Sequence, residues 1–334
     1  MVGRAILDFK SFLPAASMTH VNNTHDAPDY ILAPSDARGA LYFALALALT
    51  AAGVLLAAFG NAWAWAAGQL LLALGFSVWF VLLHECGHRT LFRSRPLNQA
   101  AGMVSAFMAL IPPTAWRHVH AFHHVWTGWQ DRDLTTMALV PRPVARYERW
   151  IINGAWRSGL PLFSLLYRVQ NFWNTPRLAR HFTPAVMRRI RLENAAYLLA
   201  YCALLAWVGP GNALRLVGCG LLLSLAFQDL LLVSQHTHMP THRAGDERVA
   251  PFSHMEQQAN TRSLRFPRWL SWLLLHIDAH ELHHMHVRVP GYHLRALAQD
   301  APNEVHWWTW LRAVKRLSGV ELMFGARERT GMLL

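Results

Sequence analysis

The chain has 334 residues, of which 53% are hydrophobic and only 15% are charged, and its formal net charge is +12. An average soluble domain has about 25% charged residues, so the composition argues against a soluble protein and favours a membrane protein. Lys10 and Lys315 are the only lysines, so arginine carries nearly all of the positive charge. Basic loops beside apolar segments are typical of membrane proteins, and we expect no nucleic-acid binding.

The first third of the chain predicts a polar leader and two membrane spans. Residues 1–38 are polar and contain several prolines, which indicates a cytoplasmic N-terminal leader. The apolar runs 39–59 and 63–83 are each long enough to cross about 30 Å of hydrocarbon. The Gly60-Asn61 turn between them predicts a helical hairpin.

The middle of the chain predicts one short apolar segment and a second hairpin. The segment 98–113 is apolar but ends in two prolines, so we expect it to lie at the interface or to re-enter the membrane. The runs 193–208 and 214–233 read as a third and a fourth span, joined by a Gly-Pro-Gly turn. Residues 240–334 are polar with amphipathic patches.

Arginine is distributed asymmetrically about these predicted spans. Twelve arginines lie from Arg117 to Arg191, whereas the short turns at 60–62 and 209–212 have no comparable charge. By the positive-inside rule, the long loops belong on the cytoplasmic side. The three cysteines, which we expect to be free thiols, fall in or beside apolar segments: Cys86, Cys202 and Cys219.

Histidine is unusually frequent, with 20 histidines against 19 acidic residues, and it is clustered. Three clusters stand out, with a looser fourth: His84-Glu85-Cys86-Gly87-His88, His120-Ala121-Phe122-His123-His124, His280-Glu281-Leu282-His283-His284, and Gln235-His236-Thr237-His238. On a helix, residues three or four apart share a face, so the outer histidines of each cluster can point at one metal. Adjacent histidines diverge by about 100°, so each adjacent pair can serve two metals.

The predicted topology brings the clusters to one place. The first cluster follows the second span, the second cluster follows a segment too short to cross, and the third follows the returning fourth span. All can meet at the cytoplasmic face. We therefore predict an all-α integral membrane protein with four transmembrane helices in two hairpins and a cytoplasmic helical cap that holds a di-metal site.

The type of ligand limits which metal ions could bind. Neutral imidazole suits zinc, copper, iron and nickel, but eight or nine imidazoles are too many for one tetrahedral zinc. His236 is the expected ninth ligand and His238 its neighbour. We expect Asp278 to orient a ligand imidazole. Six further histidines are expected to be structural, supporting or surface residues: His118, His242, His254, His276, His286 and His293.

These clusters resemble the three histidine boxes of the membrane fatty acid desaturase superfamily, over roughly residues 40–300. The run HECGHRTLF at 84–92 is similar to the box H-[DE]-C-G-H-x-x-x-F, and 116–128 (WRHVHAFHHVWTG) and 278–293 (DAHELHHMHVRVPGYH) resemble the second and third boxes. Residues 235–238 are similar to the segment after the last span of acyl-lipid desaturases. Two departures, at Arg89 and at Met285-His286, bear on the substrate rather than on metal binding.

The resemblance implies a di-iron, dioxygen-dependent enzyme that introduces a double bond into an acyl-lipid or acyl-thioester chain. It implies two Fe ions bound by the histidines that match the family's boxes: His84, His88, His120, His123, His124, His236, His280, His283 and His284. The family takes electrons from a ferredoxin or cytochrome b5-type protein. No heme- or flavin-binding domain is evident here, so we expect a separate donor, which the arginine-rich surface could dock.

The apolar runs, the arginine asymmetry and the resemblance together set the expected domains and location. We expect a leader at 1–38, a membrane desaturase-like domain at 39–300 and a cytoplasmic C-terminal tail at 301–334. The protein is expected to be multi-pass, with its active site on the cytoplasmic face, as in a bacterial inner membrane.

Three alternatives remain open at this point. The superfamily also contains hydroxylases and ketolases that act on lipids, alkanes and carotenoids, and the boxes do not separate them from desaturases. His84-Glu85-x-x-His88 also fits the H-E-x-x-H signature of a membrane zinc metalloprotease, with Glu85 as general base. The third alternative is a membrane protein that binds metal or lipid without catalysis.

Overall fold

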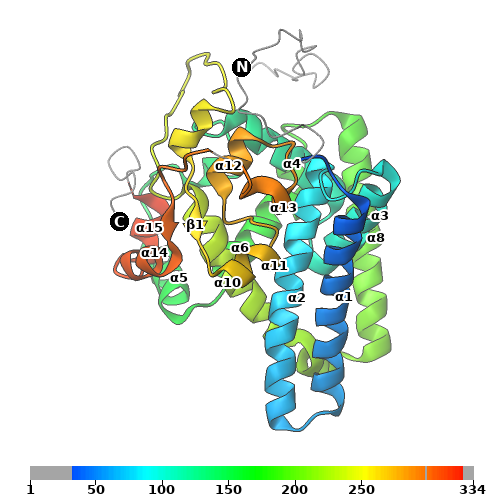
Figure 1. The fold of residues 1–334 in the computed structure, drawn as a ribbon. Coiled ribbons are helices and arrows are strands. Elements are labelled where there is room, and N and C mark those ends of the chain that lie inside the picture. Colours follow the sequence, from blue (N-terminus) through cyan, green and yellow to red (C-terminus); the bar gives the residue numbers. More distant parts are fainter. Residues whose placement is uncertain (1–31, 298, 326–334) are drawn as a thin grey trace.

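The computed structural model describes residues 32–297 and 299–325, and this part of the chain is mostly helical (Figure 1). The longer helices are α1 (Asp36–Phe59), α2 (Ala62–His88), α3 (Arg95–Ala109), α4 (Pro113–Trp126), α5 (Arg146–Ser158), α8 (Pro184–Val208) and α10 (Cys219–His236). The shorter ones are α6 (Leu162–Arg168), α7 (Thr175–Leu178), α9 (Pro210–Ala213), α11 (Arg268–Leu273), α12 (His280–Met285), α13 (Gly291–Leu294), α14 (Trp307–Val314) and α15 (Gly319–Phe324).

Single helical turns and one small strand pair complete the described chain. The turns are η1 (Met137–Leu139), η2 (Val169–Trp173), η3 (Leu214–Gly218) and η4 (Glu256–Asn260). The strands β1 (Leu264–Arg265) and β2 (Val305–His306) pair in parallel. Most of the predicted leader, 1–31, lies outside the described residues. The three cysteines are free, as expected.

Helices α1 and α2 pack side by side along their length (Figure 1). Asn61 caps the start of α2, because its side-chain oxygen accepts a hydrogen bond from the Ala64 backbone N–H at 3.0 Å. At one close contact between the two helices, Gly53 faces Gly68. A Cβ atom added to Gly68 would lie 2.7 Å from the Gly53 carbonyl oxygen, so only glycine allows this approach.

Changing Gly68 to alanine is expected to lower the free energy of unfolding by about 1–3 kcal/mol, because the new methyl group forces α1 and α2 apart. The thermal unfolding temperature of the detergent-solubilised protein measures this effect. Gly154→Ala on α5 is the matched control, since no atom lies within 4 Å of its added Cβ, and no loss is expected. If both variants unfold at the same temperature as the unmodified protein, the close contact does not contribute to stability.

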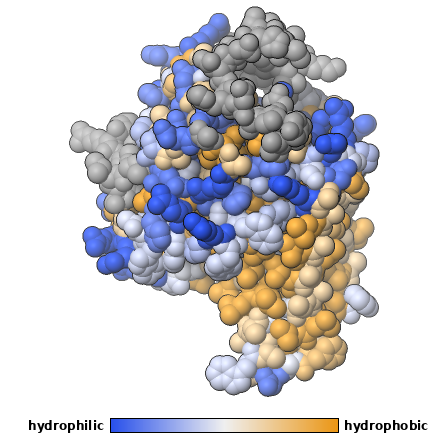
Figure 2. All heavy atoms as spheres, in the orientation of Figure 1, coloured by the Kyte–Doolittle hydropathy of each residue, from blue (hydrophilic) through white to orange (hydrophobic). Residues whose placement is uncertain are grey.

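Three helical segments are long and apolar enough to cross a membrane: Asp36–Phe59, Ala62–His88 and Pro210–His236. They contain three of the four predicted runs, and Figure 2 shows apolar side chains over the helices that project from the molecule. The remaining predicted run, 193–208, forms the second half of α8. That helix is not among the three segments, and its first half carries four charged residues: Arg188, Arg189, Arg191 and Glu193.

Most of the remaining elements form a body from which these helices project (Figure 1). We define this body as residues 113–178, 237–297 and 299–325. Helices α14 and α15 pack on α5 through one apolar cluster centred on Trp156, Trp310 and Leu322. Residues 301–325 of the predicted C-terminal tail therefore belong to this packed body, and residues 326–334 lie outside the described chain. The proposed domain boundaries stay a prediction.

Candidate metal centre

Nine histidines converge in two neighbouring groups where α2, α4, α10 and α12 meet. The first group is His84, His88, His120, His124 and His283, and the second is His123, His236, His280 and His284. In each group the candidate ligand nitrogens all lie within 4.8 Å of one another. These are the nine residues singled out from the sequence, and their role as ligands stays a prediction.

The helical spacing explains how the residues divide. Neighbours on a helix diverge by about 100°. His123 therefore points to the second group and His124 to the first, and His283 and His284 divide likewise. Rings from the two groups still touch, since the centroids of His124 and His284 are 4.4 Å apart. Two cations held here would be close neighbours.

Carboxylates fix the ring orientation of one histidine in each group. The Nδ1 of His84 lies 3.1 Å from Glu85 Oε1, and the Nδ1 of His123 lies 2.7 Å from Asp133 Oδ2. An ionised carboxylate can only accept, so each Nδ1 carries the proton and each Nε2 keeps its lone pair. Burial opposes ionisation of Asp133, but the His123 imidazole and the Thr135 backbone N–H hold the pKa of Asp133 below its usual value.

Amide and backbone oxygens orient two more rings of the second group. The side-chain nitrogen of Gln257 donates to the His124 carbonyl at 2.7 Å, which turns its oxygen towards His284 Nδ1 at 2.9 Å. The Nδ1 of His236 donates to the Asn260 carbonyl at 3.3 Å. His284 and His236 thus also present Nε2 lone pairs to the centre of the group.

The Nε2 atoms face one another at distances that suit a shared cation. His236 and His284 each carry their ring proton on Nδ1, and their Nε2 atoms lie 2.9 Å and 3.0 Å from His280 Nε2. His280 has a single proton, so at least one of these contacts brings two lone pairs together. In the first group, His84 Nε2 is buried and has no hydrogen-bond partner in the described chain. A cation bound at each group would be coordinated by these lone pairs. It would remove the repulsion between facing nitrogens and give His84 Nε2 a partner.

Burial keeps the imidazoles uncharged and available. Five histidines of α4 and α12 have pKa values well below the usual range, chiefly because burial disfavours the charged ring and secondly because the other imidazoles are close: His120, His124, His280, His283 and His284. Neutral imidazole nitrogens are good ligands for iron, zinc and copper. The residues therefore fit two transition-metal ions.

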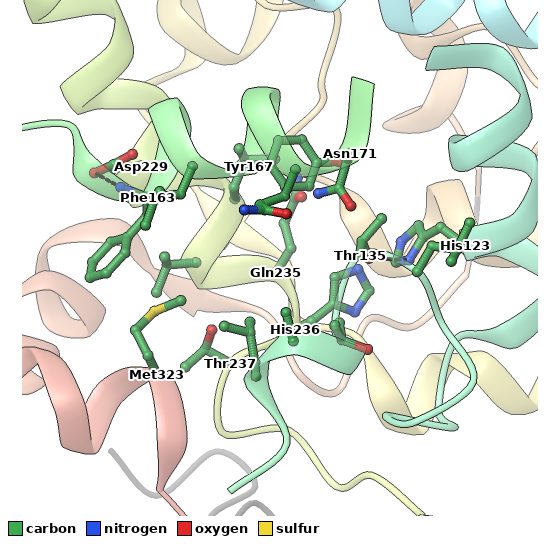
Figure 3. A pocket seen from close by; sticks show the side chains of 18 of the residues that line it. His123, Thr135, Phe163, Tyr167, Asn171, Asp229, Gln235, His236, Thr237 and Met323 are labelled. Carbon is green, nitrogen blue, oxygen red and sulfur yellow. Dashed lines mark hydrogen bonds between the residues drawn. The ribbon is translucent and has the colours of Figure 1, made fainter. Parts of the chain in front are cut away.

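A cavity of about 720 Å³ lies against both groups. His123 and His236 lie at one end of it, and Phe163 and Met323 lie towards the other (Figure 3). Its wall between these ends is mostly apolar and comes from η1, α5, α6, α10 and α15, with residues such as Leu139, Ile152, Leu162, Leu166, Leu232 and Val233. A long apolar chain could lie here with one carbon next to the histidines.

Comparison with known proteins decides the family. The family model described as "Fatty acid desaturase" matches residues 60–311, which is most of the chain and includes all nine histidines. The chain belongs to the fatty acid desaturase family.

Curated members of the desaturase family are similar to this chain at low identity. A "Fatty acid desaturase" of Bacillus subtilis is 24% identical over 64% of this chain and 62% of its own length. An "sn-1 oleoyl-lipid 12-desaturase" of Synechocystis sp. is 26% identical over 70% and 66%. An "sn-1 acyl-lipid omega-3 desaturase (ferredoxin)" of Synechocystis sp. is 33% identical over 53% and 48%. The chain thus spans less than two thirds of the length of these relatives.

In this desaturase family member, the prediction for Asp278 is wrong. Its two carboxylate oxygens accept hydrogen bonds from Ser271 Oγ and Arg295 Nη2, both at 2.7 Å. Asp278 precedes α12, so its side chain does not share the helical face of the histidines. Asp133 and Gln257 contact the rings instead. Sequence reasoning missed both, although the acidic Asp131-Arg132-Asp133 run soon after the second box was a signal for Asp133.

The other histidines that the structure describes lie outside the two groups. His238 does not take the place of His236, because its Nε2 lies 3.2 Å from the backbone oxygens of Glu321 and Leu322 in α15. Five of the six histidines expected to be structural, supporting or surface residues contact other side chains: His118 with Phe182, His242 with Trp129, His276 with Ser271, His286 with Gln299 and His293 with Arg38.

Proposed function

We propose that this chain is a multi-pass membrane desaturase that uses two iron ions and dioxygen to introduce a double bond into the acyl chain of a lipid. The observation that carries the proposal is the division of nine imidazoles, seven of them buried and two partly buried, into two neighbouring groups beside one mostly apolar cavity. Under this proposal each group holds one iron. Both groups take histidines from the second and third boxes, on α4 and α12, so the two irons form one centre.

Iron bound here would supply the oxidising chemistry that breaking an aliphatic C–H bond requires, which redox-inert zinc does not. The chain's own residues hold the reactants. The apolar wall binds the acyl chain and excludes water, and Trp116 stacks on His120 with the ring centroids 4.8 Å apart, which closes the wall beside the first group. Asp133, Gln257 and Glu85 keep the imidazoles in their orientations.

We further propose that α8 is the fourth span, so that the membrane part consists of two hairpins. The hydroxyls of Tyr197 and Tyr201 donate to the backbone carbonyls of Met103 and Phe107 in α3, at 2.9 Å and 2.8 Å. These bonds hold α8 alongside α3. The arginine-rich loops, and with them the metal centre, are then on the cytoplasmic side.

The proposed electron donor is a separate acidic redox protein of the ferredoxin or cytochrome b5 type. Two of the relatives carry "(ferredoxin)" in their names. The chain has a net charge of +12, and complementary charge speeds the encounter of a basic surface with an acidic partner.

The environment of Glu85 does not favour the metalloprotease alternative. A protease base must face a metal-bound water. Here one carboxylate oxygen of Glu85 accepts from His84, and the other accepts from Thr90 Oγ1 at 2.7 Å and from the Gly291 N–H at 2.9 Å. The carboxylate is therefore fully engaged in holding α2 to α13.

Product analysis tests the proposed reaction. The chain is expressed in a host together with a ferredoxin and its reductase, and the host lipids are analysed by mass spectrometry. We expect acyl chains with one additional double bond. Chains that have gained a hydroxyl oxygen instead would identify a hydroxylase, and unchanged lipids from iron-loaded protein would contradict both reactions.

A further inference from the structure

Helix α5 presents three different surfaces on its thirteen residues. Its inner face packs Ala155 and Trp156 against α15. Tyr147, Trp150 and Ile151 share a second face, because they are three and four residues apart, and they are 69%, 79% and 45% exposed. The third face, beside the second, carries Arg146, Arg149 and Arg157.

The exposed apolar surface continues onto α6 and the turn that follows it. Leu165, Leu166 and Val169 are 43%, 46% and 51% exposed. Helix α6 contacts both α5 and α10, and α10 belongs to one of the three candidate spans. We call these six side chains the interfacial patch: Tyr147, Trp150, Ile151, Leu165, Leu166 and Val169. A contiguous patch of this kind on a surface marks a binding site.

The patch lies where a membrane surface would be. Helix α5 is at the end of the body from which α1, α2 and α10 project (Figure 1). Tryptophan and tyrosine favour the headgroup layer, and arginines beside them attract anionic headgroups. A helix with an aromatic apolar face flanked by arginines is typical of helices that lie in the plane of the interface.

The cavity reaches the interfacial patch. Ile151 and Leu166 line the cavity and are also exposed, and Arg142 and Gln170 line it close by. A protein bound over this patch would close the opening. A bilayer would instead place acyl chains directly against it, with their polar heads near the arginines of α5.

We propose that the interfacial patch lies in the headgroup layer of an anionic bilayer and that acyl chains enter the cavity from that layer between Ile151 and Leu166. The identity of the chain that enters rests on the proposed function. The substrate is then an acyl chain of a membrane lipid, taken sideways from the bilayer, rather than a water-soluble thioester.

The depth of the patch can be measured without metal or turnover. A spin label is attached at Trp150→Cys in protein carrying Cys202→Ser and Cys219→Ser, reconstituted in phosphatidylcholine and phosphatidylglycerol vesicles. We expect relaxation by dissolved oxygen and protection from a water-soluble nickel complex. The control label at exposed Glu247→Cys is expected to show the opposite. Equal nickel access at both positions would overturn the proposal, whatever the iron content.

A second pair of variants tests the proposed entry route. Leu166→Glu places a charge at the opening, whereas Leu160→Glu places one at an exposed leucine that does not line the cavity. With vesicle phospholipid as substrate and iron content unchanged, Leu166→Glu is expected to slow conversion severalfold more than Leu160→Glu. Equal rates would overturn entry at this point, and faster conversion of acyl-coenzyme A than of vesicle lipid would overturn the substrate class.

Discussion

The His280→Ala variant is expected to insert normally, to bind one iron rather than the two that we propose, and to form no detectable product. His280 lies at the centre of the second group, with its Nε2 2.9 Å from His236 and 3.0 Å from His284. The second group has four imidazoles, so removing the His280 ring leaves three. The proposed reaction requires both metals, so losing one is expected to abolish activity.

Iron per chain and lipid products are both measured for His280→Ala. His286→Ala is the matched control, because His286 follows the same cluster but lies outside both groups and contacts Gln299. The control is expected to keep its iron and its activity. A His280→Ala protein that retained full iron and formed product would show that the second group is not a metal site.

The Asp133→Asn variant is expected to weaken iron binding by about 10- to 100-fold and to lower activity in parallel. The carboxylate holds the proton on His123 Nδ1 at 2.7 Å, whereas an amide can turn its NH2 towards that nitrogen and favour the wrong tautomer. Loss of iron to a chelator of known affinity measures the change.

Asp131→Asn is the control for this substitution. Asp131 is two residues away, and its carboxylate accepts hydrogen bonds from the Ala244 and Gly245 backbone N–H groups rather than from a histidine. It is expected to hold iron as the unmodified protein does. If chelators removed iron from both variants at the unmodified rate, Asp133 would have no part in positioning His123.

The features that sequence predicted well are set by local geometry. The spacing H-x-x-H-H on a helix determines which rings share a face, so the split of His123 from His124 followed from the 100° step between residues. The three candidate spans were visible because an apolar run of sufficient length is itself the signal. Helix α8 was harder to recognise as a span from the sequence, because its first half is charged and its apolar second half is short.

The features that sequence missed depend on contacts between distant segments. Gln257 bridges the His124 backbone and the His284 ring, and neither residue is near it in the chain. Asp278 looked well placed beside its cluster, but Arg295 and Ser271 engage it. The arginines of α5 were evident, whereas the exposure of Trp150 depends on which face of α5 packs against α15.

The most direct test of the metal centre is the metal content of the protein purified without oxygen in detergent and then incubated with ferrous iron. The two histidine groups predict about two irons per chain. One zinc per chain with no uptake of iron would contradict the di-iron centre. That result would favour a zinc site at His84-Glu85-x-x-His88.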